Sequence, residues 1–208
     1  MKDISRNSIK FSCIILIYLC YFIASSIFQS HYNLIIPRSK ITVKNLPIRF
    51  ISDLLNYYAP SILIFVLFRR RLNLRINRPA VLSGSIYLAM FLYHGNFTLT
   101  GFYIAVFYFF VAFCEEILFR GVLPSFFDKA NYKYSVIIIG LIWGSLHALS
   151  PIILNHYPFK KAIIKICSEL LGGVVSHYLF SLTAKIGKTL WLAIWIHAIL
   201  DYSSIVFP

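Results

Sequence analysis

The chain has 208 residues, of which 59% are hydrophobic and only 13% are charged. A soluble globular domain carries about 25% charged residues, so this composition excludes an ordinary soluble protein. The 20 lysines and arginines outnumber the 7 acidic residues, which gives a formal charge of +13. Because the basic residues lie almost wholly between apolar runs, contact with lipid headgroups and the topology of the chain in the membrane explain them better than a nucleic-acid partner does. The sequence therefore predicts a multi-pass integral membrane protein that binds no nucleic acid.

Three apolar segments precede residue 100. Residues 11–28 follow a short basic tail and are expected to be a retained first span, because the run is long for a signal peptide and lacks a small-residue cleavage site. Residues 50–68 form a second span, and residues 80–93 form a short third one after Pro79. Five arginines lie between the second and third spans, in RRRLNLRINR (69–78). A nucleic-acid site is one reading of such a run, but its place after an apolar span favours a cytoplasmic loop.

Four further spans are expected after residue 99, at residues 100–122, 134–149, 162–184 and 189–206. Pro124 is expected to stop or kink the first of these, and Pro151 to lie just beyond the second. The adjacent Gly172 and Gly173 are expected to allow close helix packing. The prediction is an all-α membrane bundle of about seven transmembrane helices, divided into N-terminal spans (1–99) and a core (100–206). The distribution of lysine and arginine favours a cytoplasmic N-terminus.

Two glutamates and an arginine interrupt the fourth span, in VAFCEEILFRG (111–121). An ionised side chain at membrane depth costs at least ~2.5–3.5 kcal/mol, so three of them need partners and indicate a function. Glu116 and Arg120 are four residues apart and can pair across one helical turn. Glu115 points about 100° away from Glu116 and remains available for chemistry. A structural ion pair between packed helices is the alternative.

Two further polar clusters lie in other spans. His147 follows Trp143 by one turn in the fifth span, and His197 precedes Asp201 by one turn in the seventh. A glutamate can take a proton from water, and an imidazole can hold that water or share a metal ion with it. His197 and Asp201 could position a carbonyl, donate to an oxyanion or complete a metal site. The alternative is that each histidine is a packing residue.

One difficulty is the depth of these groups in the membrane. With alternating spans that end where the sequence suggests, Glu115 lies near the cytoplasmic end of its helix and His147 near the outer end of the next. A kink at Pro124, a re-entrant segment or a shifted fifth helix could bring them level. The cysteines do not add a motif, since no CxxC pair is present and all four lie in apolar segments: Cys13, Cys20, Cys114 and Cys167. Cys114 is expected to be a small buried hydrophobe rather than a ligand or nucleophile.

The three polar motifs together resemble a known family. An EExxxR motif (Glu115, Glu116, Arg120), an aromatic residue four before a histidine (Trp143, His147) and an HxxxD motif (His197, Asp201) occur in the order typical of CPBP intramembrane proteases. This family contains the type II CAAX prenyl endopeptidases and the bacteriocin-processing or bacteriocin-immunity (Abi) proteins. Two departures are visible: Trp143 stands where the family usually has phenylalanine, and Asp201 stands where the eukaryotic CAAX enzymes have asparagine.

The resemblance implies a four-helix catalytic core and peptide-bond hydrolysis within or beside the bilayer, which is a hydrolase activity of the EC 3.4 class. It implies that Glu115 activates water that His147 helps to hold, and that Glu116 and Arg120 support this step. His197 and Asp201 would stabilise the oxyanion or orient the substrate. Whether a divalent metal such as Zn²⁺ takes part stays open, and Glu115, His147 and His197 are its candidate ligands.

The expected partner is a small peptide or a membrane-protein segment in the lipid bilayer. Small size and short loops suggest a bacterial cell membrane, where a pheromone or bacteriocin precursor is a more plausible substrate than a prenylated protein. Two other functions compete with this one: a bacteriocin-immunity or scaffold protein without catalysis, and a small proton-coupled transporter that uses Glu115 and the histidines as a relay. The sequence does not indicate an oligomeric state.

Overall fold

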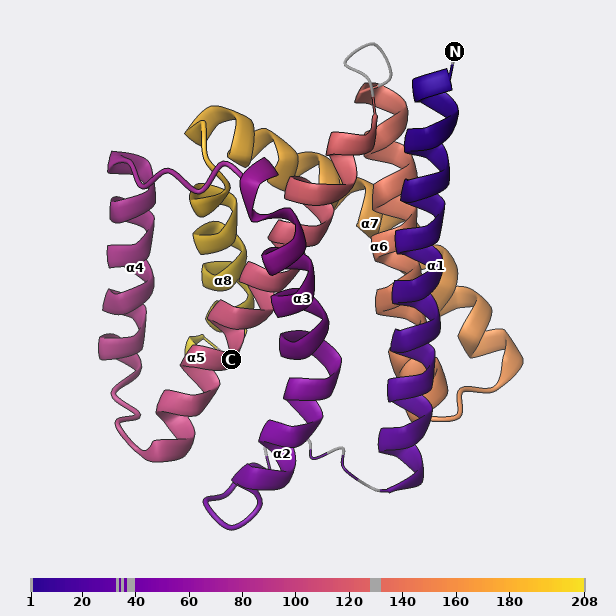
Figure 1. Ribbon diagram of the computed structural model, residues 1–208. Coiled ribbons are helices and arrows are strands. Elements are labelled where there is room, and N and C mark those ends of the chain that lie inside the picture. Colours follow the sequence, from indigo (N-terminus) through magenta and orange to yellow (C-terminus); the bar gives the residue numbers. More distant parts are fainter. Residues whose placement is uncertain (1, 33, 35, 37–39, 128–131, 208) are drawn as a thin grey trace.

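The computed structural model describes residues 2–32, 34, 36, 40–127 and 132–207, and this part of the chain is helical without strands (Figure 1). Several helical segments are composite, because π-helical or 3₁₀ turns (η) continue the α-helices. In chain order the segments are α1 (Lys2–His31); α2 (Leu46–Asp53) with η2 (Leu54–Tyr58), α3 (Ala59–Phe68) and η3 (Arg69–Arg71); α4 (Arg78–His94); α5 (Leu99–Glu115) with η4 (Glu116–Val122) and η5 (Leu123–Phe126); α6 (Tyr132–Leu154); α7 (Phe159–Gly187); and α8 (Leu190–Val206).

Five of these segments are long and apolar enough to cross a membrane: Ile9–His31, Leu46–Arg71, Leu99–Phe126, Tyr134–Leu154 and Phe159–Gly187. The remaining two, α4 and α8, have 17 residues each and are therefore roughly 26 Å long. The prediction of an all-helical, polytopic membrane bundle is confirmed. The chain is a multi-pass integral membrane protein.

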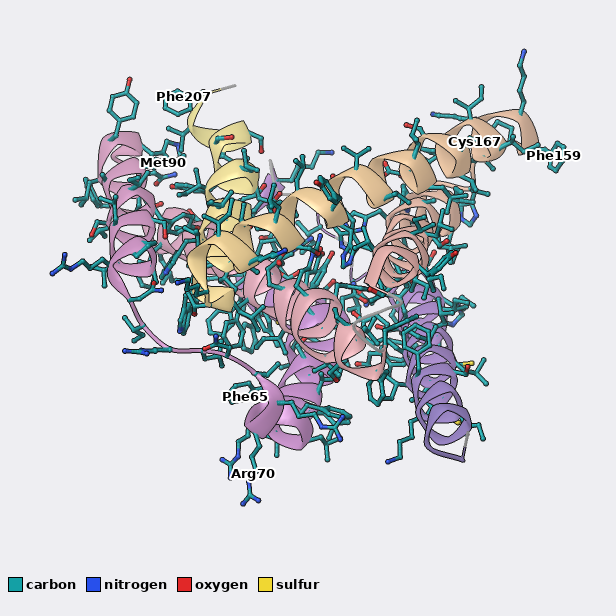
Figure 2. All side chains as sticks on the ribbon, turned by 90° about the horizontal axis from the view of Figure 1, so that it is seen from above. Phe65, Arg70, Met90, Phe159, Cys167 and Phe207 are labelled. Atoms are coloured by element: carbon teal, nitrogen blue, oxygen red, sulfur yellow. The ribbon has the colours of Figure 1, made fainter. Side chains whose placement is uncertain are left out.

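The helices pack around the slanted α5–η4–η5 segment (Figure 1). On its two sides, α1 contacts α6, and α4 contacts α8. Seen from above, α7 extends obliquely from Phe159 at one edge of the molecule toward α8 (Figure 2). The buried apolar side chains form two clusters, one around η4 and α6 and the other around α5 and α8. The segment that carries the paired glutamates therefore lies at the centre of the bundle.

Among the helix ends that differ from the sequence prediction, two bear on the position of the polar clusters. Pro151 was expected beyond the fifth helix, but α6 continues through it to Leu154. Proline removes one helical hydrogen bond without forbidding the helix, and Pro151 lies in the last turn of α6, where few such bonds remain. The fourth span runs past Val122 to Phe126, where the 3₁₀ turn around Pro124 ends it. Residues 128–131, between η5 and α6, and residues 33, 35 and 37–39, between α1 and α2, lie outside the described residues.

Close packing between α6 and α7 depends on glycines in both helices. A Cβ atom at Gly140 would lie 2.6 Å from Cα of Val174, and one at Gly173 would lie 2.4 Å from the Gly140 carbonyl oxygen. The predicted packing role of Gly173 is thus confirmed. The same prediction for Gly172 is wrong, because nothing lies within 4 Å of its Cβ position.

This difference between glycines gives a test of the α6–α7 contact. A Cβ atom at Gly144 would lie 2.1 Å from the Glu169 carbonyl oxygen, so Gly144→Ala must push the helices apart. We expect a loss of about 1–3 kcal/mol of stability, measured as a lower thermal unfolding midpoint in detergent. Gly172→Ala is the matched control, and it should leave the midpoint unchanged or raise it slightly. Equal midpoints for both variants would contradict the predicted tight contact.

Candidate active site

The two adjacent glutamates lie where the backbone changes from an α-helix to a π-helical turn. Glu115 is the last residue of α5, and Glu116 is the first residue of η4. Single-turn π-helical segments in helices often occur at functional sites. The side chain of Glu115 is 12% exposed, whereas that of Glu116 is fully buried. One carboxylate therefore reaches a cavity while its neighbour faces the protein interior.

The Glu116 carboxylate has two partners, the guanidinium of Arg120 and the imidazole of His197. Its Oε1 atom lies 3.1 Å from Nη1 of Arg120, as the spacing of four residues predicted. The same oxygen accepts a hydrogen bond of 2.8 Å from Nδ1 of His197, which comes from α8. A buried charge is tolerated only when it is paired in this way. The Glu116–Arg120 pair thus links η4 to the helix that carries the second histidine.

Aromatic rings cover the guanidinium of Arg120 on η4. Its Cζ atom lies 4.7 Å from the ring centre of Trp143 and 5.0 Å from that of Phe180. Phe180, on α7, also stacks on the His197 ring at a centroid distance of 4.5 Å. Phe180 could not be recognised from the sequence, because an apolar residue in an apolar helix gives no signal of such a contact.

Glu115 faces both predicted catalytic histidines. Its Oε1 atom lies 3.8 Å from Nε2 of His147, and its Oε2 atom lies 4.0 Å from Nε2 of His197. Two hydrogen bonds through one water molecule readily span such separations. His197 Nε2 also lies 3.6 Å from Oδ2 of Asp201, one turn further along α8. The three polar motifs predicted from the sequence therefore meet in one place.

Each imidazole is oriented by an acceptor on its other nitrogen. Nδ1 of His147 donates to the backbone carbonyl of Trp143 over 3.0 Å, and Nδ1 of His197 donates to Glu116. Because a carbonyl oxygen only accepts, the proton of neutral His147 is assigned to Nδ1. Its Nε2 atom then presents a lone pair toward Glu115. This arrangement suits an imidazole that holds a water molecule beside a carboxylate.

The expected mismatch in depth is wrong because both predicted helix ends were misplaced. Glu115 lies eleven residues before the end of its composite helix at Phe126, and His147 lies fifteen residues after the start of α6 at Tyr132. These two ends are at the same end of the bundle (Figure 1). At 1.5 Å per residue the two depths are roughly 16 and 22 Å, and helix tilt brings the side chains together. A re-entrant segment is not needed.

A cavity of about 220 Å³ adjoins Glu115 and His147. Residues of α1, η2, α3, α5, η4 and α6 line it: Tyr18, Phe22, Tyr57, Ser61, Cys114, Glu115, Phe119, Trp143, Leu146, His147 and Pro151. Cys114 is buried, as expected. The cavity is therefore lined mainly by aromatic and apolar residues, and the Glu115 carboxylate, the His147 imidazole and three hydroxyl-bearing residues (Tyr18, Tyr57 and Ser61) are among its lining, a mixture typical of small binding sites.

Trp143 contributes a hydrogen bond that its sequence motif did not reveal. Its indole Nε1 donates to Oε2 of Glu115 over 2.5 Å, and its ring lies 4.5 Å from that of His147. Phenylalanine, the usual family residue by the resemblance described above, cannot make this bond. Trp143 is therefore a positioning residue for the Glu115 carboxylate in this chain.

Trp143→Phe tests this contact, because it keeps an aromatic ring and removes the N–H donor, together with part of the indole volume. Since a hydrogen bond to a charged group contributes about 1.5–3 kcal/mol, we expect roughly a 10- to 100-fold loss in kcat with little change in KM. Trp191→Phe is the matched control, because Nε1 of Trp191 donates to the Leu74 carbonyl and not to the site. A similar loss in both variants would show that a general effect of removing an indole is responsible.

The donor set of Glu115, His147 and His197 has the chemistry of a zinc site, with each imidazole anchored through Nδ1. However, the described residues contain no group of three His, Cys, Asp or Glu side chains placed to hold one metal ion. A metal ion bound by Glu115, His147 and His197 therefore stays a prediction, and the reaction proposed below does not depend on it. Metal analysis of the purified protein and its sensitivity to 1,10-phenanthroline would test it.

These features define a class of protein: a polytopic helical membrane protein with a buried cluster of glutamate, histidine and arginine from three helices. A family model described as "Type II CAAX prenyl endopeptidase Rce1-like" matches residues 97–203, which is half of the chain. The chain belongs to this family, as its motifs predicted. The matched region contains all six predicted catalytic residues: Glu115, Glu116, Arg120, His147, His197 and Asp201. No curated protein and no solved structure gives a significant match.

Proposed function

We propose that this protein is an intramembrane endopeptidase that hydrolyses a peptide bond in a small or membrane-associated polypeptide. The observation that carries the proposal is the approach of one partly exposed carboxylate, Glu115, to the Nε2 atoms of His147 and His197. Family membership adds to it, because the family description is that of an endopeptidase. The proposed location is a bacterial cell membrane, with the N-terminus on the cytoplasmic side.

In the proposed reaction a water molecule lies between Glu115 and His147. Glu115 takes a proton from this water while the oxygen attacks the scissile carbonyl carbon. The carbonyl oxygen becomes an oxyanion, and His197, protonated on both nitrogens, donates Nδ1–H to Glu116 and Nε2–H toward that oxygen. Glu115 then passes its proton to the leaving amine, so that water is consumed and two peptide ends form.

The residues around this centre act by holding it in place. Trp143 fixes the Glu115 carboxylate, and the Glu116–Arg120 pair fixes His197. Asp201 is close enough to His197 Nε2 to orient that imidazole or the substrate. Preorganised groups of this kind reduce the reorganisation that the reaction requires.

Mass spectrometry of reaction products in ¹⁸O-labelled water tests the proposed function. The purified protein in lipid nanodiscs is incubated with internally quenched CAAX peptides, with and without a farnesyl group, and with a hydrophobic precursor peptide. We expect cleavage at one bond of at least one probe, with one ¹⁸O atom at the new C-terminus. Failure to cleave any of the three, by a protein that is folded by thermal unfolding, would contradict the proposal.

A further inference from the structure

A second cluster of charge lies at the end of the bundle that contains the start of α4 and the α7–α8 turn (Figure 1). Seven exposed basic residues form it, and we call them the arginine rim: Arg69, Arg70, Arg71, Arg75, Arg78, Lys185 and Lys188. Among the described residues, none of the seven forms an ion pair with a carboxylate. So many adjacent like charges repel one another and favour an anionic partner.

The segment that carries the arginines is fixed rather than a free loop. Five hydrogen bonds join it to a part of the chain more than 100 residues away: Asn73 Nδ2 to the Lys188 carbonyl (2.8 Å), Asn77 Nδ2 to the Gly187 carbonyl (2.7 Å), Leu190 N to the Asn73 carbonyl (3.0 Å), Thr189 Oγ1 to the same carbonyl (3.3 Å) and Trp191 Nε1 to the Leu74 carbonyl (3.0 Å). The basic side chains of residues 69–78 and of the α7–α8 turn therefore lie on one hydrogen-bonded unit. We call this unit, residues 69–78 together with residues 185–191, the platform.

This platform also contacts the two segments that carry the candidate active site. A Cβ atom at Gly121, the residue after Arg120, would lie 2.5 Å from Cδ2 of Leu72 and 3.0 Å from Cδ1 of Leu190. Helix α8, which carries His197, starts at Leu190. Movement of the platform must therefore be transmitted to both η4 and α8, because packed interiors have little free space.

Exposed apolar side chains lie next to the basic ones in the sequence, at Leu67, Ile76 and Ile186. Basic groups beside apolar groups match the boundary between lipid headgroups and acyl chains. We propose that the arginine rim is a binding site for the phosphodiester headgroups of anionic phospholipids, and that this binding stabilises the end of η4 and the start of α8. This inference holds whatever reaction the buried site performs.

The test compares short-chain fluorescent phosphatidylglycerol with phosphatidylcholine, bound to the purified full chain in detergent. We expect at least about tenfold tighter binding of phosphatidylglycerol, since each basic residue near a membrane surface adds to the attraction. In a variant with Arg69, Arg70, Arg75 and Arg78 replaced by glutamine, this preference should fall to about twofold or less. Arg71 is left in place because its guanidinium lies over the rings of Phe68 and Phe126.

A charge-matched control replaces four exposed lysines outside the rim, two before α2 and two at the start of α7, with glutamine: Lys40, Lys44, Lys160 and Lys161. This control should keep the full preference. Phosphatidylglycerol nanodiscs should also raise the unfolding midpoint of the wild-type protein, but not that of the rim variant, relative to phosphatidylcholine nanodiscs.

Equal affinity of the wild-type protein for both lipids, or an equal loss in the control variant, would overturn the proposal. Displacement of phosphatidylglycerol by polyglutamate at similar charge concentration would identify an acidic polypeptide as the occupant and would also overturn it. If the rim variant does not fold, the affinities of the wild-type protein for the two lipids, and their dependence on salt, decide the outcome. At about 1 M salt the Debye length is about 3 Å, so phosphatidylglycerol binding should weaken strongly while phosphatidylcholine binding should not.

Discussion

Replacing Glu115 with glutamine is expected to leave the protein folded and to lower peptide hydrolysis by about 10²–10⁴-fold, the range that loss of a general base produces. Glutamine has nearly the same shape, and its amide oxygen can still accept the hydrogen bond from Trp143 Nε1. However, an amide cannot take a proton from water. The measurement is kcat/KM for the peptide probe that the wild-type protein cleaves, together with the thermal unfolding midpoint.

Glu169→Gln is the matched control for this experiment. Glu169 lies on α7, forms an ion pair of 2.5 Å with Lys165 and is partly exposed, outside the candidate site. The same loss of one carboxylate there should leave hydrolysis unchanged. Wild-type hydrolysis by the Glu115→Gln protein would show that Glu115 is not the base.

The same variant separates the proposed protease from the other functions that the sequence left open. An immunity or scaffold protein does not depend on a base, so its phenotype should survive Glu115→Gln. A proton-coupled transporter would lose transport in this variant, but its wild-type form would cleave no peptide. The loss of cleavage with retained folding is expected only for the protease.

Much of the fold could be predicted because the bilayer imposes a simple rule: a spanning helix needs a long apolar run. The ends of the helices could not be predicted equally well. Pro151 was taken as a boundary, although a proline in the last turns of a packed helix removes only one hydrogen bond. This error placed His147 at the end of its helix and, together with the early end expected for the fourth span, created the expected mismatch with Glu115.

The site was predictable where its contacts are local. The Glu116–Arg120 pair follows directly from a spacing of four residues. The Trp143–Glu115 hydrogen bond and the cover of Phe180 over His197 depend on how α6 and α7 cross η4. A sequence pattern carries no information about the rotation of one helix against another, so these two contacts could not be predicted from the sequence.

Arg120→Met is expected to destabilise the protein by about 3–5 kcal/mol, because the buried Glu116 carboxylate keeps the hydrogen bond from His197 but loses the guanidinium of Arg120. Glu116 is fully buried, and Arg120 is 1% exposed. Methionine keeps an unbranched apolar side chain that can still pack between Trp143 and Phe180, so the lost charge should dominate over lost volume. The measurement is the free energy of unfolding in detergent mixtures or, where unfolding is irreversible, the shift in the unfolding midpoint.

The double variant Glu116→Gln/Arg120→Met distinguishes the unpaired charge from a packing defect. Because it removes both charges, it should be more stable than Arg120→Met alone, with a coupling of about 0.5–3 kcal/mol. Lys165→Met is the matched control, since Lys165 and Glu169 are also four residues apart in a helix but are partly exposed on both sides. Exposed pairs contribute about 0–1 kcal/mol, so this variant should change stability little. Equal losses of stability in Arg120→Met and Lys165→Met would show that the buried Glu116–Arg120 pair contributes no more than an exposed pair. In that case the pair does not hold η4 in place.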